Sequence, residues 1–175
     1  MVIHIIILKN KIKKMNKELS LSVVICALIH NNKILLIERI KGDYVGLLGL
    51  PGGKIEKNEH LSQAATREIF EESGIKAGFR DYLGIVSEHL IEEDDIIAKH
   101  FLLHICHLAP KSVEIKSGGE GKLNWFDLTG IERIKNKVIP SDFIIIDKMV
   151  KNREKNYYNC VIRKSSGIYV LEKFE

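Results

Sequence analysis

Cysteine is scarce in this chain of 175 residues: only Cys26, Cys106 and Cys160 are present, and none of them forms a CxxC pair. An odd, scattered set excludes a disulfide framework and a zinc knuckle, and reduced thiols are typical of cytoplasmic proteins. The longest apolar run near the start, Ile5 to Leu8, is too short to cross a membrane, and no basic leader precedes it. We therefore expect a cytoplasmic protein without a membrane partner.

An excess of charge of one sign is also missing. With 27 basic and 23 acidic residues the formal net charge is +4, whereas a nucleic-acid binder concentrates basic residues on one face. The basic segment at residues 9–17 is more typical of a solvated connector, so no nucleic-acid partner is expected. At 45% hydrophobic and 29% charged residues, the composition excludes a disordered or collagen-like chain.

The length is typical of one domain, and we expect residues 1–175 to form it, with a core at about 20–152. Apolar, β-branched segments and two helical patterns predict an α/β fold with a mixed sheet between helices. An N-terminal strand at residues 2–8 and a C-terminal hairpin at 156–174 are expected to extend the sheet or to form a homodimer contact. The expected core elements are strands at 21–30, 33–39, 82–90, 96–108 and 123–128, a helix at 60–73, and a second helix that begins at Pro140 with Ser141 as a cap.

The first expected helix carries an unusual acidic stripe. Glu71 and Glu72 lie three and four positions after Glu68, so the three carboxylates share one helical face, which continues from Ala64 and Ala65. Like charges beside a half-buried stripe repel one another and lose hydration unless a cation compensates them. Oxygen ligands at this density suit Mg²⁺ or Mn²⁺.

A glycine-rich loop at residues 42–53 precedes this helix and ends in Gly52 and Gly53. Glycine lets the backbone approach a phosphate or a metal without intervening side chains. Arg67 lies among the carboxylates, where it can pair with one of them and hold its position. Together these features favour a metal and phosphate site over a solvated acidic face.

From Gly53 through Glu59 to the stretch Arg67–Ile75, residues and spacing resemble the complete signature of the Nudix hydrolases. Weaker similarity extends to Leu35–Arg39 before the loop and to Trp125–Phe126 after the helix. The resemblance implies a Nudix fold and hydrolysis of a nucleoside diphosphate linked to another moiety, with Mg²⁺ or Mn²⁺. The implied substrate is a small-molecule nucleotide, such as a nucleoside triphosphate or a nucleotide sugar.

The resemblance also assigns roles by position in the signature. Arg67 would orient the carboxylates and Glu59 would support the start of the helix. Arg39 would contact the phosphates, and Gly52 and Gly53 are the loop residues whose backbone is expected to approach them. The implied metal ligands are the carboxylates of Glu68, Glu71 and Glu72 and the carbonyl of Gly53.

The general base stays open between two glutamates. Glu68 could take the proton as well as bind metal, and Glu120, in a second glycine-rich loop, is the best candidate outside the signature. Two alternative functions stay open: a Nudix-fold nucleotide-binding or regulatory module, which would usually have lost a signature glutamate, and an RNA-processing Nudix enzyme, which would need a basic surface. Sequence marks of several substrate classes are missing downstream, which favours a nucleoside triphosphate or a generalist.

Overall fold

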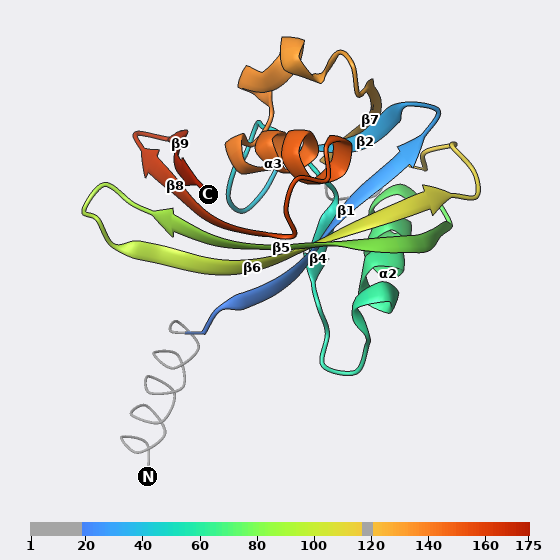
Figure 1. Ribbon diagram of the computed structural model, residues 1–175, viewed down its shortest axis with the longest axis horizontal. Coiled ribbons are helices and arrows are strands. Elements are labelled where there is room, and N and C mark those ends of the chain that lie inside the picture. The colour runs from blue at the N-terminus through green and yellow to red at the C-terminus, as the bar shows by residue number, and fades with distance from the viewer. Residues whose placement is uncertain (1–18, 117–120) are drawn as a thin grey trace.

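The computed structural model describes residues 19–116 and 121–175, so the expected strand at residues 2–8 and the candidate base Glu120 lie outside the described residues. Within these described residues, nine strands form one sheet. The sheet is curled and has helices on both faces (Figure 1). This arrangement confirms the predicted mixed sheet between helices. Within the two described segments, no helix is long and apolar enough to span a membrane.

The hairpin of β1 (Leu21–His30) and β2 (Lys33–Arg39) lies at the centre of the sheet and has the predicted boundaries. Its turn residues Asn31 and Asn32 have positive φ angles of 45° and 61°, as a two-residue hairpin turn requires. The two strands pair with each other only next to the turn. Further along, β1 pairs in parallel with β6 and β2 pairs antiparallel with β7, so the sheet curls between them.

The strand order is β3-β2-β1-β6-β5-β8-β9, with β4 paired to β1 and β7 paired to β2. The short strands β3 and β4 lie in the glycine-rich segment that the sequence predicts as loop, and the first β5 residue is Ala77 rather than the expected Tyr82. The remaining bounds are β3 (Leu48–Gly49), β4 (Gly52–Lys54), β5 (Ala77–Ile91), β6 (Ile97–Pro110), β7 (Gly121–Asp127), β8 (Tyr157–Ser165) and β9 (Ile168–Phe174).

Each face of the sheet has its own apolar core. The helix α2 (Leu61–Ser73) buries Ile69 against one face, next to Val24. The opposite face is covered by α3 (Pro140–Ile145), which continues as a π-helical segment, η2 (Ile146–Lys151). A 3₁₀ helix, η1 (Ile131–Lys137), precedes α3.

The second helix begins as predicted at Pro140, but the expected cap is wrong. Ile139 occupies the N-cap position and makes no side-chain cap, while Ser141 is buried in the first turn. The side chain of Ser141 lines a pocket beneath the glycine-rich loop instead.

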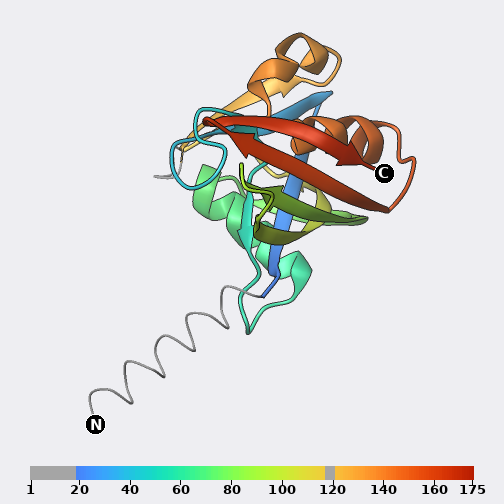
Figure 2. The ribbon, with the colours of Figure 1, turned by 90° about the vertical axis from the view of Figure 1, so that its left-hand side faces the viewer.

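The C-terminal hairpin extends the sheet, as predicted. β8 pairs in parallel with β5, and β9 pairs antiparallel with β8 and forms the outer edge. The turn at Ser166 and Gly167 has positive φ angles of 49° and 80°. Figure 2 shows this hairpin, in red, crossing beside the loop that follows β2.

Candidate active site

Local signals place α2 and its carboxylates. The helix begins after His60, whose backbone N–H donates to Gln63 Oε1 at 2.7 Å. It ends at Gly74, which has a φ of 69° and donates to the Phe70 carbonyl at 2.8 Å. Glycine at this left-handed position is the usual way for a helix to end. The acidic stripe therefore spans the last turns of a helix with two well-defined ends.

The stripe is partly buried, as its sequence pattern predicts. The exposed fraction of Glu68 is 9% and that of Glu72 is 3%, whereas the side chain of Glu71 is 57% exposed. Ala64 and Ala65, earlier on the same face, are fully buried. Two carboxylates are thus held out of bulk water beside a third, an arrangement that charge repulsion disfavours without a compensating cation.

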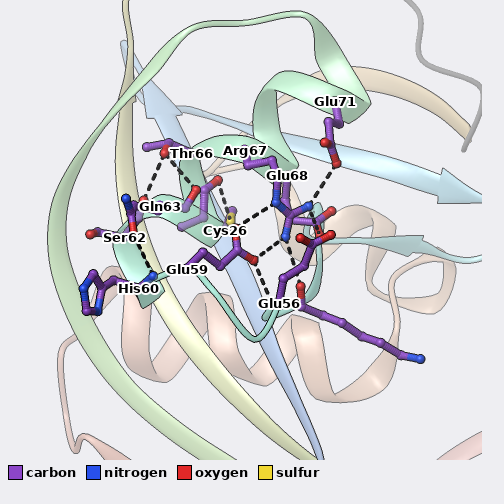
Figure 3. Close-up of polar contacts among 12 residues, drawn as sticks. Cys26, Glu56, Glu59, His60, Ser62, Gln63, Thr66, Arg67, Glu68 and Glu71 are labelled. Atoms are coloured by element: carbon purple, nitrogen blue, oxygen red, sulfur yellow. Dashed lines mark hydrogen bonds and ion pairs between the residues drawn. The ribbon is translucent and has the colours of Figure 1, made fainter.

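Arg67 provides part of that compensation (Figure 3). Its Nη1 lies 2.8 Å from Glu68 Oε1 and 3.0 Å from Glu71 Oε2. On its other side, Nη2 and Nε bind both carboxylate oxygens of Glu59, at 2.6 and 2.9 Å. These hydrogen bonds lower the pKa of Glu59 to about 2 and raise the pKa of Arg67. Arg67 therefore forms ion pairs with Glu59, Glu68 and Glu71 at the same time.

The loop before α2 approaches these carboxylates closely. The Gly52 N–H donates to Glu72 Oε2 at 3.2 Å. A Cβ on Gly52, whose φ is 155°, would lie 2.0 Å from the Val24 carbonyl oxygen, and one on Gly53 would lie 2.5 Å from Glu68 Oε1. Position 52 therefore requires glycine, whereas a side chain at Gly53 would displace the Glu68 carboxylate, and the backbone of this loop forms one wall of the site.

An open cleft of about 790 Å³ brings most of the predicted site residues together. Arg67 does not line the cleft but donates a hydrogen bond to Glu68, which does. Lys41, Gly42 and Lys54 also line the cleft, and the sequence interpretation did not single them out. The predicted residues that line it are Arg39, Gly52, Gly53, Glu68, Glu71 and Glu72. Within residues 19–116 and 121–175, no three His, Cys, Asp or Glu side chains form a ready-made metal-binding group.

A smaller pocket of about 200 Å³ adjoins this cleft and shares Arg39 and the loop glycines with it. Apolar side chains from β1 and β6 form its walls. Its polar lining comes from the loop after β2, from β5 and from α3. These polar lining residues are Asp43, Tyr44, Glu88, Ser141 and Asp142.

Two carboxyl groups in the pocket lining are almost fully buried. Asp142 is 4% exposed, and its Oδ2 accepts a hydrogen bond from the Leu50 N–H at 2.7 Å. Burial raises the pKa of Asp142 to about 7. Glu88 is 2% exposed, and burial likewise raises its pKa, although its Oε1 accepts a hydrogen bond from Tyr44 Oη at 2.8 Å. Near neutral pH this region can therefore hold a proton that ordinary carboxylates release.

The sequence interpretation missed the pocket because its lining comes from distant segments. One local signal was available: Glu88 lies between Val86 and Leu90 on the inward face of β5, where a carboxylate is out of place. In the sequence, Asp142 is only an acidic residue in the first turn of a helix, where its charge is favourable. Its burial depends on packing against the loop at Leu50, which no local pattern reveals.

Comparison with known proteins agrees with this geometry. Residues 20–145 match the NUDIX domain. An ADP-ribose pyrophosphatase from Methanocaldococcus jannaschii is 32% identical over 132 residues, which cover 74% of this chain and 75% of that protein. A CTP pyrophosphohydrolase from Escherichia coli is 28% identical over 132 residues, which cover 74% of this chain and 92% of the relative.

Among solved structures, a MutT protein from Bacillus halodurans has the same fold. Its TM-score is 0.69 at 21% identity, and the match covers 89% of this chain and 96% of the other. The sequence match extends from β1 to α3 and so includes the loop, α2 and both faces of the cleft. The chain therefore belongs to the Nudix hydrolase family, whose enzymes act on pyrophosphate bonds.

Proposed function

We propose that this enzyme is a metal-dependent pyrophosphohydrolase that cleaves a nucleoside diphosphate linked to another moiety by attack of water at phosphorus. The observation that carries the proposal is the composition of the cleft. Three carboxylates of α2 line it together with three loop glycines, and a largely apolar pocket opens beside them. With a metal bound, the acidic cleft suits a polyphosphate, and the adjoining pocket suits a less polar group attached to it.

The donors in the cleft fit a hard divalent cation. Glu68, Glu71 and Glu72 would hold Mg²⁺ or Mn²⁺ together with the carbonyl of Gly53, because such ions prefer oxygen ligands. Glu68 and Glu71 both accept a hydrogen bond from Nη1 of Arg67. Two of the carboxylates therefore already lie around one positive charge, which supports the proposal that they would bind a metal cation. When bound, the metal would neutralise charge on the phosphates and lower the pKa of a bound water.

The side chains of the protein would position the polyphosphate. Arg39, Lys41 and Lys54 line the same cleft and supply positive charge for phosphoryl oxygens. Arg39 Nε is held by the Asp43 carbonyl at 3.1 Å, which orients the guanidinium. Arg67 is committed to three carboxylates, so its role would be to hold them in place. Glu68 or Glu120 would accept the proton of the attacking water.

The adjoining pocket would receive the nucleobase. Its walls include Val23, Ile25 and Leu103, which suit the faces of a planar ring. Ser141 and Asp142 offer polar atoms for the edge of the ring.

The substrate class proposed is a nucleoside triphosphate or a nucleotide sugar. The relatives from M. jannaschii and E. coli are described as acting on ADP-ribose and on CTP, which supports both halves of this class. In each compound a charged pyrophosphate connects a nucleoside to a second group. The acidic cleft would hold the pyrophosphate of such a compound, and the adjoining pocket would hold its nucleobase.

The test is a hydrolysis screen of the purified protein with Mg²⁺ and with Mn²⁺. The panel holds the common nucleoside triphosphates, ADP-ribose and several nucleoside diphosphate sugars, and products are separated by chromatography. We expect at least one compound to be cleaved within its pyrophosphate, and Glu72→Gln to abolish most of that cleavage. Absence of cleavage across the panel, or equal rates for the variant, would overturn the proposal.

A further inference from the structure

Tyr169, on the C-terminal hairpin, contacts the glycine-rich loop from outside the cleft. Its Oη accepts a hydrogen bond from the backbone N–H of Tyr44 at 3.0 Å. The two rings pack with their centroids 4.4 Å apart and their planes inclined by 44°. Tyr169 lines neither the cleft nor the adjoining pocket, whereas Tyr44 lines the pocket. Figure 2 shows β9 beside this loop.

The backbone of Tyr44 adopts a conformation that needs support. Its φ is 62°, in the left-handed region that a bulky residue rarely occupies and that strains the backbone. Gly42 and Gly46, on either side, also have positive φ angles, of 75° and 84°. A loop with these angles has many alternatives, so contacts from outside the loop must select this one.

The contacts that stabilise this conformation of the loop include one in the pocket. Tyr44 is only 7% exposed, and its Oη donates to Glu88 Oε1 at 2.8 Å. The neighbouring Asp43 is bound by Lys99 Nζ at 2.6 Å, and its carbonyl accepts from Arg39. Asp43 and Arg39 thus have an anchor of their own in Lys99, whereas the contact with Glu88 in the pocket depends on the position of Tyr44.

We propose that Tyr169 is a positioning residue for substrate binding, which acts through the backbone of Tyr44 on the shape of the pocket beside the acidic cleft. The inference rests on the proposed function, because it takes this pocket as the site of the nucleobase. The hydroxyl of Tyr169 is the critical group. Without it the Tyr44 N–H loses its partner and the left-handed conformation loses one of its supports.

Tyr169→Phe removes only this hydroxyl and keeps the ring packing. With the best substrate from the screen, we expect KM to rise about three- to tenfold, the effect of one lost hydrogen bond, and kcat to stay within twofold. Inhibition by methylenebisphosphonate, which would occupy only the acidic cleft, should not change. A nucleoside monophosphate, which also needs the pocket, should inhibit the variant less.

Hydrogen exchange measures the same contact without any substrate. The Tyr44 amide should exchange faster in Tyr169→Phe than in the unmodified protein. Tyr157→Phe is the matched control, because Tyr157 lies on the same hairpin, is half exposed and donates to Asn159 at 2.7 Å on the surface. It should change neither KM nor the exchange of Tyr44.

The outcomes separate this inference from the proposed function. If the unmodified protein cleaves no nucleotide, the proposed function fails whatever Tyr169 does. If it cleaves one, and Tyr169→Phe shows an unchanged KM, unchanged exchange at Tyr44, or a loss confined to kcat, the positioning role is wrong. A similar loss of affinity for methylenebisphosphonate would also contradict it, because the effect would then not be specific to the pocket.

Discussion

Arg67 and Glu59 lie eight residues apart, on α2 and on the loop before it, and their side chains meet in a two-pronged ion pair. Nη2 lies 2.6 Å from Oε1 and Nε lies 2.9 Å from Oε2. The remaining Arg67 nitrogen, Nη1, contacts Glu68 and Glu71. Glu59 therefore aligns the carboxylates of the cleft without lining the cleft itself.

This ion pair predicts a pH dependence of stability. The hydrogen bonds from Arg67 lower the folded-state pKa of Glu59 from 4.5 to about 2. A depressed pKa stabilises the fold above the unfolded-state value and loses this effect as pH falls through the folded-state value. Glu59→Gln should therefore lower the free energy of unfolding at pH 7, and the deficit should shrink between about pH 4.5 and pH 2. Urea unfolding at several pH values measures it.

Glu56→Gln provides the control for Glu59→Gln, because Glu56 is exposed on the same loop and contributes its backbone N–H to Glu59. Its side chain can be neutralised without touching the ion pair with Arg67. A deficit for Glu59→Gln that stayed constant down to pH 2 would show that the pair does not supply this stability.

Hydrolysis should require an added divalent cation. The carboxylates of Glu68, Glu71 and Glu72 line the same cleft as the presumed phosphate contacts and would repel a polyphosphate without a metal between them. Protein treated with chelator and dialysed should lose activity, and Mg²⁺ or Mn²⁺ should restore it in a saturable manner. Full activity in the stripped protein would contradict this mechanism.

Glu71→Gln and Glu72→Gln should each reduce turnover by about a hundredfold or more, because charge stabilisation at the reacting phosphate is lost. The metal-free fold should be unharmed or slightly stabilised, since one repulsive charge is removed from the stripe. Steady-state kinetics and thermal melting without metal measure the two effects. Glu56→Gln, the same change outside the cleft, should keep full activity, and equal activity of all three variants would contradict the assigned roles.

The parts of the fold that the sequence predicts are those with local causes. The α2 boundaries follow from the apolar period and from Gly74, and the β1–β2 turn follows from the tolerance of asparagine for positive φ. The acidic face of α2 follows from helical spacing alone. These features depend on residues within a few positions of one another, which is why a single sequence reveals them.

The parts that it does not predict depend on contacts between distant segments. β5 is longer than predicted, because its first residues pair with the end of β6 and its register shifts near Gly84. The pocket needs Tyr44, Glu88 and Asp142 from three separate elements. The hydrogen bond from Tyr44 to Tyr169 spans 125 positions, and nothing in the local sequence of either residue indicates it.

The buried carboxyl of Asp142 predicts a pH dependence of the opposite sign to that of Glu59. Burial raises its folded-state pKa from 3.8 to about 7, although the Leu50 N–H and Arg39 oppose the shift. Between these two values the folded protein keeps a proton that the unfolded chain releases, so stability falls as pH rises toward 7 and then levels. The loss from pH 5 to pH 8 should amount to about 2 kcal/mol.

Asp142→Asn should remove this loss, because an asparagine oxygen can still accept the hydrogen bond from Leu50 and carries no charge to bury. The melting temperature of the variant relative to that of the unmodified protein should therefore rise by roughly 5 °C between pH 5 and pH 8. Glu88 also has a raised pKa and should retain its own pH dependence in both proteins. Asp147→Asn, an exposed change in the following π-helical segment, is the control and should leave the pH profile unchanged. If the melting temperatures of Asp142→Asn and of the unmodified protein changed in parallel with pH, Asp142 would be ionised in the folded protein at every pH tested. The proton proposed for the pocket would then have to reside elsewhere.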